Sequence, residues 1–410
     1  MSEWRRTKLG DCADWLSGGT PFKGNPAFWS GTIPWVSAKD MKSFCLHDAE
    51  DHIAADAGGK LVPSGTVLML VRGMTLHNDV PICVTMCEMA FNQDIKAICA
   101  KPGLEHQFLA YWLLAHKPAL LSAVDHAGHG TGRLLTDLLK QMPVDLPSLS
   151  EQRAISSVLG ALDDKIELNR RMNETLEALA RALFQNWFVE ATQAGLPKGW
   201  REVPLPEAIE VNPSRPLRKG EVAPYLDMAN MPTRAARAME VYDREFGSGM
   251  RFLDGDTLVA RITPCLENGK TCFVDFLGDG KVGWGSTEYV VLCPKPPLPP
   301  EYAYFLARTE SFRAFAISNM TGTSGRQRVP ADSLNNFTVV VPPAQTAERF
   351  GQFARGVFAQ LKAHDDESRT LAALRDALLP KLLSGELRLP SQGFGTAGVP
   401  AAAKIVEAHA

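Results

Sequence analysis

The 410-residue sequence has no long hydrophobic run. Its strongest apolar stretches, VLMLV (67–71) and VVV (339–341), are far shorter than the roughly 18 residues that a membrane span requires. The N-terminus, MSEWRRTKLG, lacks the apolar core of a secretory signal. We therefore expect a cytoplasmic chain with no membrane partner.

The sequence also lacks the motifs of common catalytic sites. It contains no GxxxxGK[ST] loop, no GxGxxG after a strand, no GxSxG, no HExxH and no element of the Asn/Asp-Pro-Pro-aromatic type that amino-methyltransferases use on adenine. Asp79, Asp94 and Lys96 could together hold Mg²⁺ in a nuclease, but the second half of the chain has no lysine at the matching place. We expect no catalytic residues.

Cysteine spacing gives no indication of a metal site. The eight cysteines form no CxxC pair. Cys83 and Cys87 could be combined with His77 as ligands, but VPICVTMC is more typical of an apolar strand with buried thiols. Reduced thiols and no metal are expected.

No strong excess of one charge is present either. The formal net charge is −3 and the sequence pI is about 6.3, which excludes a uniformly basic coat for nucleic acid. Local basic patches can still bind DNA within such a chain.

The chain resembles itself at an offset of 193 to 195 positions. The matching pairs are 92–99 (NQDIKAIC) with 286–293 (STEYVVLC), 131–133 (TGR) with 324–326 (SGR), Gln152 with Gln345, and 176–184 (LEALARALF) with 371–379 (LAALRDALL). Four matches in the same order indicate a duplication.

Each half follows the same order of elements. Short β-like runs come first, then a helical stretch, a glycine-rich polar segment, a proline-bounded strand and a long helix. In the first half these are 61–71, 80–86 and 95–99, then 106–123, 128–133 and 142–147; in the second they are 256–262, 270–276 and 288–293, then 301–317, 322–328 and 337–343. This order predicts two mixed domains of about 145 residues, each followed by a helix.

Both long helices carry a seven-residue repeat. Ser148 and Glu151 form a capping box at the start of the first. The seam comprises Ile155, Leu162, Asn169, Asn173, Leu176 and Leu183 in the first helix and Val357, Leu361, His364, Ser368, Leu371 and Leu378 in the second.

The middle of each seam is polar. The helices could pair parallel or antiparallel, and antiparallel pairing would bring the polar residues Asn169 and Asn173 to His364 and Ser368. Such a layer fixes register; alternatively, the helices splay and this face is solvated. A pair of about 35 residues would span about 50 Å and act as a spacer.

Two similar domains, a spacer and no visible chemistry indicate a bivalent recognition device. Arginine can bond guanine bidentately, and glutamine can do the same to adenine. Candidate DNA-binding residues are Lys39, Arg72, His77, His129, Thr131, Arg133, Arg261, Asn268, Lys270, Ser324, Arg326, Gln327 and Arg328. The alternative for each is a solvated surface loop.

Several segments resemble one known family. ARITPCLENGK (260–270), GWGSTEYVVL (283–292), MTGTSGRQRV (320–329), PSLSEQRAISSVLGALDDKIELN (147–169), LRDALLPKLLSGEL (374–387) and FNQDIKAI (91–98) are similar to the specificity subunit of type I restriction–modification systems. The resemblance covers about residues 5–390.

The resemblance implies an α+β fold of two similar mixed α/β target recognition domains, separated by two long antiparallel coiled-coil helices in a pseudo-two-fold repeat. The expected boundaries are 1–147 and 198–343 for the domains, 148–190 and 344–388 for the helices, and 391–410 for a disordered tail.

The implied function is recognition of a bipartite double-stranded DNA target, with two methyltransferase subunits and restriction (motor–nuclease) subunits as partners. S-adenosylmethionine, ATP and Mg²⁺ would belong to those partners, and this chain would carry no cofactor. The alternatives are a nuclease or methyltransferase with an unrecognised active site, and a scaffold without sequence preference.

Overall fold

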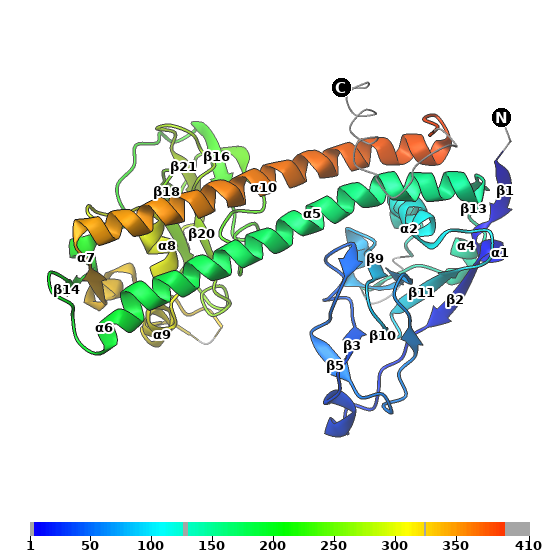
Figure 1. Cartoon of the computed structure of the whole chain (residues 1–410), viewed down its shortest axis with the longest axis horizontal. Helices are drawn as coiled ribbons and strands as arrows, with labels where there is room; N and C mark the ends of the chain where they lie inside the picture. Colours follow the sequence, from blue (N-terminus) through cyan, green and yellow to red (C-terminus); the bar gives the residue numbers. More distant parts are fainter. Residues whose placement is uncertain (1–3, 126–129, 324, 390–410) are drawn as a thin grey trace. The chain divides into compact units, whose positions relative to one another are not determined.

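The computed structural model describes residues 4–125, 130–323 and 325–389. It divides into two compact units, unit 1 comprising Met1–Ile166 with Arg369–Ala410 and unit 2 comprising Glu167–Ser368. Each unit is mixed α/β, and the boundary between them falls within two long helices, α5 (Leu149–Phe184) and α10 (Ala344–Ser384), drawn in green and orange in Figure 1.

The strands of unit 1 form two larger sheets and two strand pairs. One sheet has the order β5-β3-β10-β6 and the other β2-β11-β7-β9-β4, while β1 pairs with β13 and β8 with β12. Pairing is antiparallel except between β3 and β10 and between β4 and β9. The strands are β1 (Arg5–Lys8), β2 (Ala13–Ser17), β3 (Ile33–Val36), β4 (Cys45–Leu46), β5 (Asp51–Ile53), β6 (Leu61–Val62), β7 (Val67–Leu70), β8 (Arg72–Gly73), β9 (Ile82–Thr85), β10 (Met89–Phe91), β11 (Ile95–Ala100), β12 (Gly132–Arg133) and β13 (Pro143–Leu146).

Among the described residues, unit 2 repeats this topology except that β4 has no counterpart and the β8–β12 pair is reduced to isolated bridges. Its sheets have the orders β17-β16-β21-β18 and β15-β22-β19-β20, and β14 pairs with β23. The single parallel pair, β16 with β21, corresponds to β3 with β10. The strands are β14 (Arg201–Pro204), β15 (Ile209–Val211), β16 (Val222–Leu226), β17 (Tyr242–Glu245), β18 (Met250–Phe252), β19 (Thr257–Ala260), β20 (Thr271–Phe273), β21 (Gly283–Gly285), β22 (Tyr289–Pro294) and β23 (Thr338–Val341). The predicted internal repeat is therefore confirmed.

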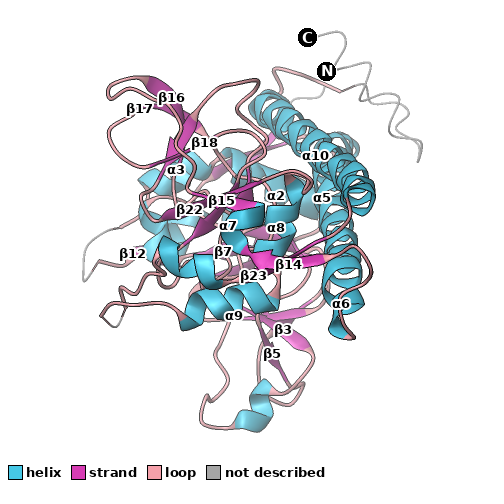
Figure 2. Ribbon diagram, turned by 90° about the vertical axis from the view of Figure 1, so that its left-hand side faces the viewer, coloured by secondary structure: helices cyan, strands magenta, loops and turns pink. Residues whose placement is uncertain are grey.

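The apolar runs form the central strands of each unit. All four residues of β7 and all four of β19 are buried, so both faces of these central strands are covered, one of them by a helix. In unit 1 that helix is α2 (His106–Ala115) and in unit 2 it is α8 (Glu301–Arg308) (Figure 2).

Local signals divide each predicted helical stretch in two. Pro118 lies at the start of α3 (Lys117–Ser122), where the missing amide hydrogen costs nothing but the preceding helix cannot continue. In unit 2, the Thr309 hydroxyl accepts from the Phe312 amide at 3.3 Å and caps α9 (Glu310–Ser318). Glu105 caps α2 similarly, accepting from the Phe108 amide at 2.7 Å.

The remaining helical segments are short, with three to six residues each. They are α1 (Leu9–Cys12), α4 (Thr136–Lys140), α6 (Ala191–Gln193), α7 (Leu205–Ala208), 3₁₀ turns at Pro26–Trp29, Met74–His77 and Ala331–Asn336, and a π-helical segment at Gln185–Glu190. Helix α5 begins as predicted, because the Ser148 hydroxyl accepts from the Glu151 amide at 3.3 Å. The π-helical segment that continues it was not predicted from the sequence.

The two long helices run antiparallel within each unit. In unit 2, Asn169 contacts Ser368 whereas Asn173 contacts Asp365, so that position numbers rise on α5 as they fall on α10. The predicted antiparallel pair is confirmed (Figure 1). The tail 391–410, expected to be disordered, lies outside the described residues.

Candidate nucleic-acid interface

In both units, the polar glycine-rich loop lies against the segment that follows a central strand. In unit 2, the backbone of Arg328 forms isolated β-bridges with Ile262 and with Thr321, and the Val329 amide donates to the Arg261 carbonyl at 2.9 Å. In unit 1, Arg133 pairs with Arg72 and Asp125, and the Leu134 amide donates to the Val71 carbonyl at 2.8 Å. The same backbone connection thus holds the loop in both copies.

These bridges correct one detail of the repeat. The sequence match placed Arg133 over Arg326, but the backbone pattern gives Arg133 the position of Arg328, two residues later. The helices likewise begin 195 positions apart, at Leu149 and Ala344, so the match of Gln152 with Gln345 is also wrong by two positions. Strand β22 begins 194 positions after β11, as the sequence match predicted.

Glu288 organises the charged residues of the unit 2 loop. Both of its carboxylate oxygens accept from Arg328 Nε at 2.8 Å, and Arg261 Nε lies 3.7 Å from Oε2. The Glu288 carboxylate raises the pKa of the Arg328 guanidinium. The Arg328 guanidinium is therefore occupied in holding the loop, Arg261 lies within ion-pair distance of the same carboxylate, and Arg326 is exposed.

The adjoining loop after β19 is fixed by arginines from the helices. Arg308 donates to the Gly269 carbonyl at 3.1 Å, and Arg313 donates to the Glu267 carbonyl at 2.8 Å. The Lys270 ammonium donates to the Met228 carbonyl and is half-buried. Asn268 is exposed at the tip of this rigid loop.

The remaining unit 2 loop residue, Gln327, is half-buried. Its carbonyl accepts from both the amide and the hydroxyl of Thr263 at 3.0 Å. The bond uses only the main chain, which leaves the Gln327 amide side chain available to a ligand. Ser324, another candidate, lies outside the described residues.

In unit 1 the equivalent loop presents arginines without a Glu288-like bond. Arg72 and Arg133 are exposed and lie directly opposite one another on β8 and β12. The residue at the Glu288 position is Asp94, whose carbonyl accepts from the Arg72 amide at 3.2 Å. Two like charges opposite one another are unfavourable unless an anion lies near them, which makes this pair a candidate contact for an anion such as a phosphate.

The other unit 1 candidates are more dispersed. The His77 ring bonds the Gly130 carbonyl at 2.7 Å and so joins the Met74–His77 turn to the glycine loop, where Thr131 is half-buried. Lys39 lies elsewhere and pairs with Glu50 and Asp51 at 3.0 Å, and these carboxylates raise its pKa. His129 lies outside the described residues.

Sequence reasoning missed Glu288, Arg308 and Arg313. One signal was present for Glu288: an acidic residue stands at the same repeat position in both halves, Asp94 and Glu288. No such signal marked Arg308 and Arg313, because their partners are main-chain carbonyls, which any residue type supplies.

The polar seam residues meet within unit 2. Asn169 is fully buried, and its amide nitrogen donates to Glu367 at 2.8 Å and to the Ser368 hydroxyl at 3.3 Å. Asn173 contacts the His364 ring at 2.7 Å through its amide oxygen. The helices are packed at this layer, so the alternative of splayed, solvated helices is wrong.

Several of the other seam residues lie where the helices meet the domain cores. Those that are buried are Ile155, Leu162, Val357 and Leu361, and those that are half-buried are Leu176, Leu183, Leu371 and Leu378. Ile155 belongs to the core of unit 1, and Val357 and Leu361 belong to the main core of unit 2.

Asp79 and Lys96, two of the three residues considered for catalysis, are each paired with another side chain. Asp79 accepts from the Lys117 ammonium at 2.9 Å, and the Lys96 ammonium donates to Ser17. Cys83 is buried, and burial raises the pKa of its thiol to about 12. Within the described part of the chain, no three His, Cys, Asp or Glu side chains are grouped so that they could hold a metal ion, and no helix has the length and apolar character to span a membrane.

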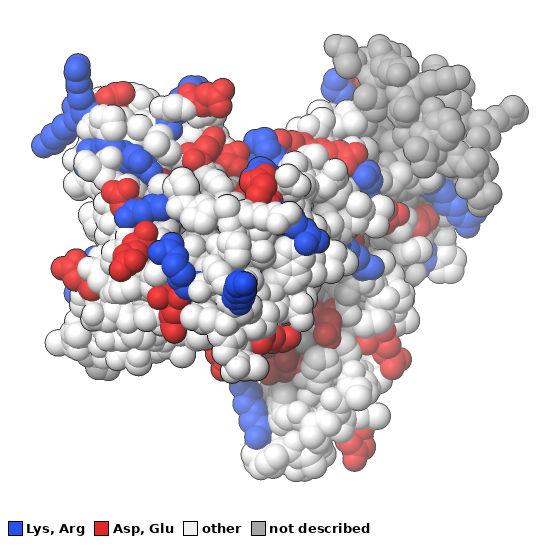
Figure 3. Space-filling view, turned by 60° about the vertical axis from the view of Figure 1, so that its left-hand side comes forward, with Lys and Arg blue, Asp and Glu red and all other residues white. Residues whose placement is uncertain are grey.

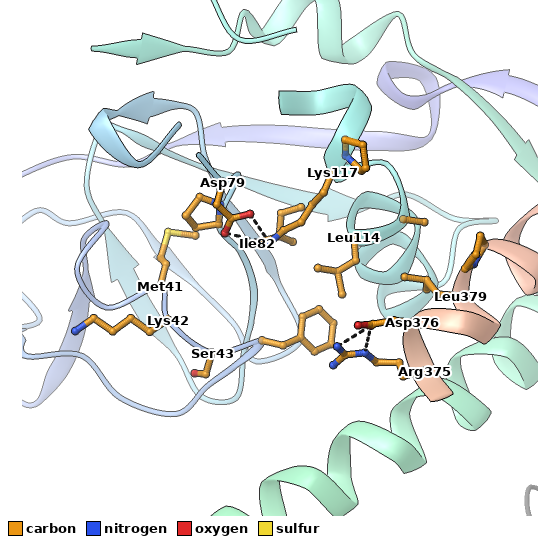
Figure 4. A pocket seen from close by; sticks show the side chains of 15 residues that line it. Met41, Lys42, Ser43, Asp79, Ile82, Leu114, Lys117, Arg375, Asp376 and Leu379 are labelled. Carbon is orange, nitrogen blue, oxygen red and sulfur yellow. Dashed lines mark hydrogen bonds and ion pairs between the residues drawn. The ribbon is translucent and has the colours of Figure 1, made fainter. Parts of the chain in front are cut away.

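One of the larger cavities shows no sign of a reactive centre. This cavity of about 620 Å³ in unit 1 lies between Phe44, Leu114 and the end of α10, and four of its charged lining residues form ion pairs, Lys117 with Asp79 and Arg375 with Asp376 (Figure 4). On the face shown in Figure 3, basic side chains lie among acidic ones rather than in one continuous area.

Comparisons with known proteins agree along the chain. Residues 1–178 match the model of the type I restriction modification DNA specificity domain. The specificity subunit of the type I restriction enzyme MjaIX from Methanocaldococcus jannaschii is 22% identical over 94% of each chain. The specificity subunit of EcoEI from Escherichia coli is 30% identical, over 49% of this chain and 37% of its own.

The fold is shared with a solved structure. The type I restriction–modification S subunit from M. genitalium covers 92% of this chain and 96% of its own, with a TM-score of 0.56 and 14% identity. The domain match in the first half, the relative aligned over nearly the whole length and the common fold agree with one another. Residues 1–178 therefore match the type I restriction modification DNA specificity domain, and the chain is similar over nearly its whole length to a type I specificity subunit.

Proposed function

We propose that this chain is the DNA-specificity subunit of a type I restriction–modification complex and that it reads a bipartite target, one half-site with each unit. The observation that carries the proposal is the repetition of the central strand order of both sheets, with an arginine-bearing glycine loop on the same backbone connection in both copies. Two copies of one reading device need two half-sites.

The half-sites should differ, because the two loops carry different side chains. Unit 1 offers Arg72 and Arg133, whereas unit 2 offers Arg326, Gln327 and Asn268. Arginine favours guanine, while glutamine and asparagine favour adenine, so the unit 2 half-site should include adenine.

Helices α5 and α10 serve as the spacer and as the scaffold in this proposal. The antiparallel pair would hold the recognition domains at a fixed separation and bind two methyltransferase subunits and the restriction subunits. This chain supplies no chemistry of its own. S-adenosylmethionine, ATP and Mg²⁺ would be bound by those partner subunits.

The test is adenine methylation in a host that has no other methyltransferase. The chain is expressed with its methyltransferase subunit, and genomic methyladenine is mapped by sequencing. We expect one motif of two short half-sites with a fixed unspecified gap, and none when either protein is omitted. Methylation by this chain alone would favour an unrecognised methyltransferase. Methylation of a continuous motif, or of no particular motif, would contradict bipartite recognition.

A further inference from the structure

The polar layer between α5 and α10 in unit 2 continues into the globular part of the unit. Asp365 on α10 accepts from the Asn173 amide through Oδ1 at 2.9 Å and from Arg237 Nη1 through Oδ2 at 2.7 Å. Arg237 belongs to the recognition domain, in the segment between β16 and β17. One carboxylate therefore joins the helix–helix layer to the domain.

Arg237 is closely surrounded. Its side chain is only 5% exposed, and Nε donates to Asp275 Oδ2 at 2.7 Å. Asp275 follows β20 and is 15% exposed; burial raises the pKa of its carboxyl, which the Arg237 guanidinium opposes. The Lys362 ammonium of α10 also donates to the Asp275 carbonyl at 3.3 Å. Helix, arginine and sheet edge form one network.

The segment 233–237 is held from both sides. On the sheet side, the Phe273 amide of β20 donates to the Ala236 carbonyl at 2.9 Å. On the helix side, Arg181 of α5 donates to the Arg234 carbonyl at 2.8 Å. Both long helices therefore contact this segment, α5 through Arg181 and α10 through Asp365.

Such a joint differs physically from an apolar contact. Leucine side chains on a helix can repack after a shift of one turn, whereas a buried guanidinium between two carboxylates requires one geometry. Any shift of the domain along α10 would leave partly buried charges unpaired, which is strongly unfavourable.

We propose that Arg237 and Asp365 form the joint that fixes the second recognition domain at one position on the helix pair, and that this joint makes the complex selective for a single gap between half-sites. The inference rests on the proposed bipartite recognition. Arg237 and Asp365 are positioning residues in this role and contact no base.

The experiment uses the full chain with its methyltransferase subunit and a library in which the two mapped half-sites are separated by every gap from three base pairs below to three above the preferred one. Arg237→Met removes the joint and keeps most of the apolar stem. We expect unchanged half-site bases, and discrimination against gaps one pair too short or too long should fall by roughly tenfold, an effect of the size seen when coupling within one network is lost. Arg237→Lys, which can reach one carboxylate but cannot bridge two, should restore part of it.

The chain offers a matched control in Arg215. Its guanidinium is 19% exposed and pairs with the buried Asp256 at 3.0 Å, both residues flanking the sheet of the same domain. Arg215→Met should lower the melting temperature of the complex but keep the gap discrimination of the wild type. Equal loss of discrimination in Arg215→Met and Arg237→Met would show a general effect of instability and overturn the joint.

Two outcomes separate this inference from the proposed function. Full gap discrimination in Arg237→Met, with a bipartite motif in the wild type, would overturn the joint alone. A wild-type chain that directs no bipartite methylation would overturn the proposed function. If Arg237→Met does not accumulate, Asp365→Asn keeps the shape of the network, removes one charge and should give a smaller loss of discrimination.

Discussion

Arginine side chains in and beside the unit 2 loops fall into two groups according to what they contact. Arg328 and Arg261 lie against the Glu288 carboxylate, and Arg308 donates to main-chain carbonyls. Arg326 is exposed. The sequence predicted which residue types stand in these loops, but not their partners, because a carboxylate forty residues away in the chain decides which guanidinium is occupied.

We expect Arg326→Ala to weaken recognition of one half-site without lowering stability, since the side chain is exposed. If Arg326 contacts a guanine, the loss should be about 1–3 kcal/mol, with relaxed specificity at that base. If it contacts a phosphate, affinity should fall for all sequences and the salt slope should fall by about one. Titration of the assembled complex against half-site variants at several salt concentrations measures both quantities; no change in either would remove Arg326 from the interface.

Arg328→Ala is the contrasting variant. It leaves Glu288 with only the more distant Arg261, so the loop should lose order and the melting temperature should fall together with the affinity. A variant with weaker DNA binding and an unchanged melting temperature would show that Arg328 contacts DNA directly.

Among the elements, the long helices were predicted best. The seven-residue repeat gave their positions, their polar middle and the meeting of Asn169 and Asn173 with His364 and Ser368. It could not give Asp365 or Glu367, because these residues lie beside the seam and reach the layer through the length and charge of their side chains.

Those partners decide what apolar substitution of the layer will do. In Asn169→Leu with Asn173→Leu, the His364 ring and Asp365 Oδ1 each lose an asparagine partner. The loss should cost about 1–3 kcal/mol at the buried His364 and less at Asp365, whose side chain is 34% exposed and can bind water. We expect a lower melting temperature. Adding His364→Leu and Ser368→Leu should recover stability but permit other registers, which light scattering would detect as self-association. A higher melting temperature for the double variant would contradict the layer described here.

A carboxylate on helix α5 should make a contribution to the stability of the folded state that is lost in acid. Hydrogen bonds from Arg170 and then Arg171 lower the pKa of Glu167 from 4.5 to about 2. A depressed carboxyl pKa stabilises the folded state above about pH 4.5, and this stabilisation is lost as the pH falls toward 2. The wild type should therefore exceed Glu167→Gln in melting temperature at pH 7, and the difference should shrink progressively below pH 4.5. Glu174→Gln, on an exposed partner of Arg170, is the control and should give a smaller difference at pH 7. A Glu167→Gln difference that is the same at pH 7 and pH 3 would contradict this origin.

For the molecule as a whole, the duplication was the most informative feature of the sequence. It gave the repeated topology and the register of β11 and β22, since buried strands tolerate no insertion without turning their side chains to the other face. It misaligned Arg133, because the glycine loop before it differs in length between the halves and the residue letters alone matched two positions early. The duplication did not predict pairs such as Arg237 with Asp365, since these residues are 128 positions apart in the sequence.

The spacer hypothesis can be tested where the two units divide. The boundaries fall between Ile166 and Glu167 on α5 and between Ser368 and Arg369 on α10, so four residues inserted at each place would lengthen both helices and leave the contacts within each unit intact. Four residues add about 6 Å and come close to one turn of about 3.6 residues, which keeps the seam on the same face. Since DNA rises about 3.4 Å per base pair, the preferred gap should grow by one or two pairs. One pair is the stronger expectation, because each added pair also rotates the second half-site around the duplex.

The same four residues inserted after Leu196, before β14, provide the control and should leave the gap unchanged. Methylation mapping decides the matter: a gap that does not grow, or half-site bases that change although neither recognition domain was altered, would refute the helix pair as the element that sets the distance.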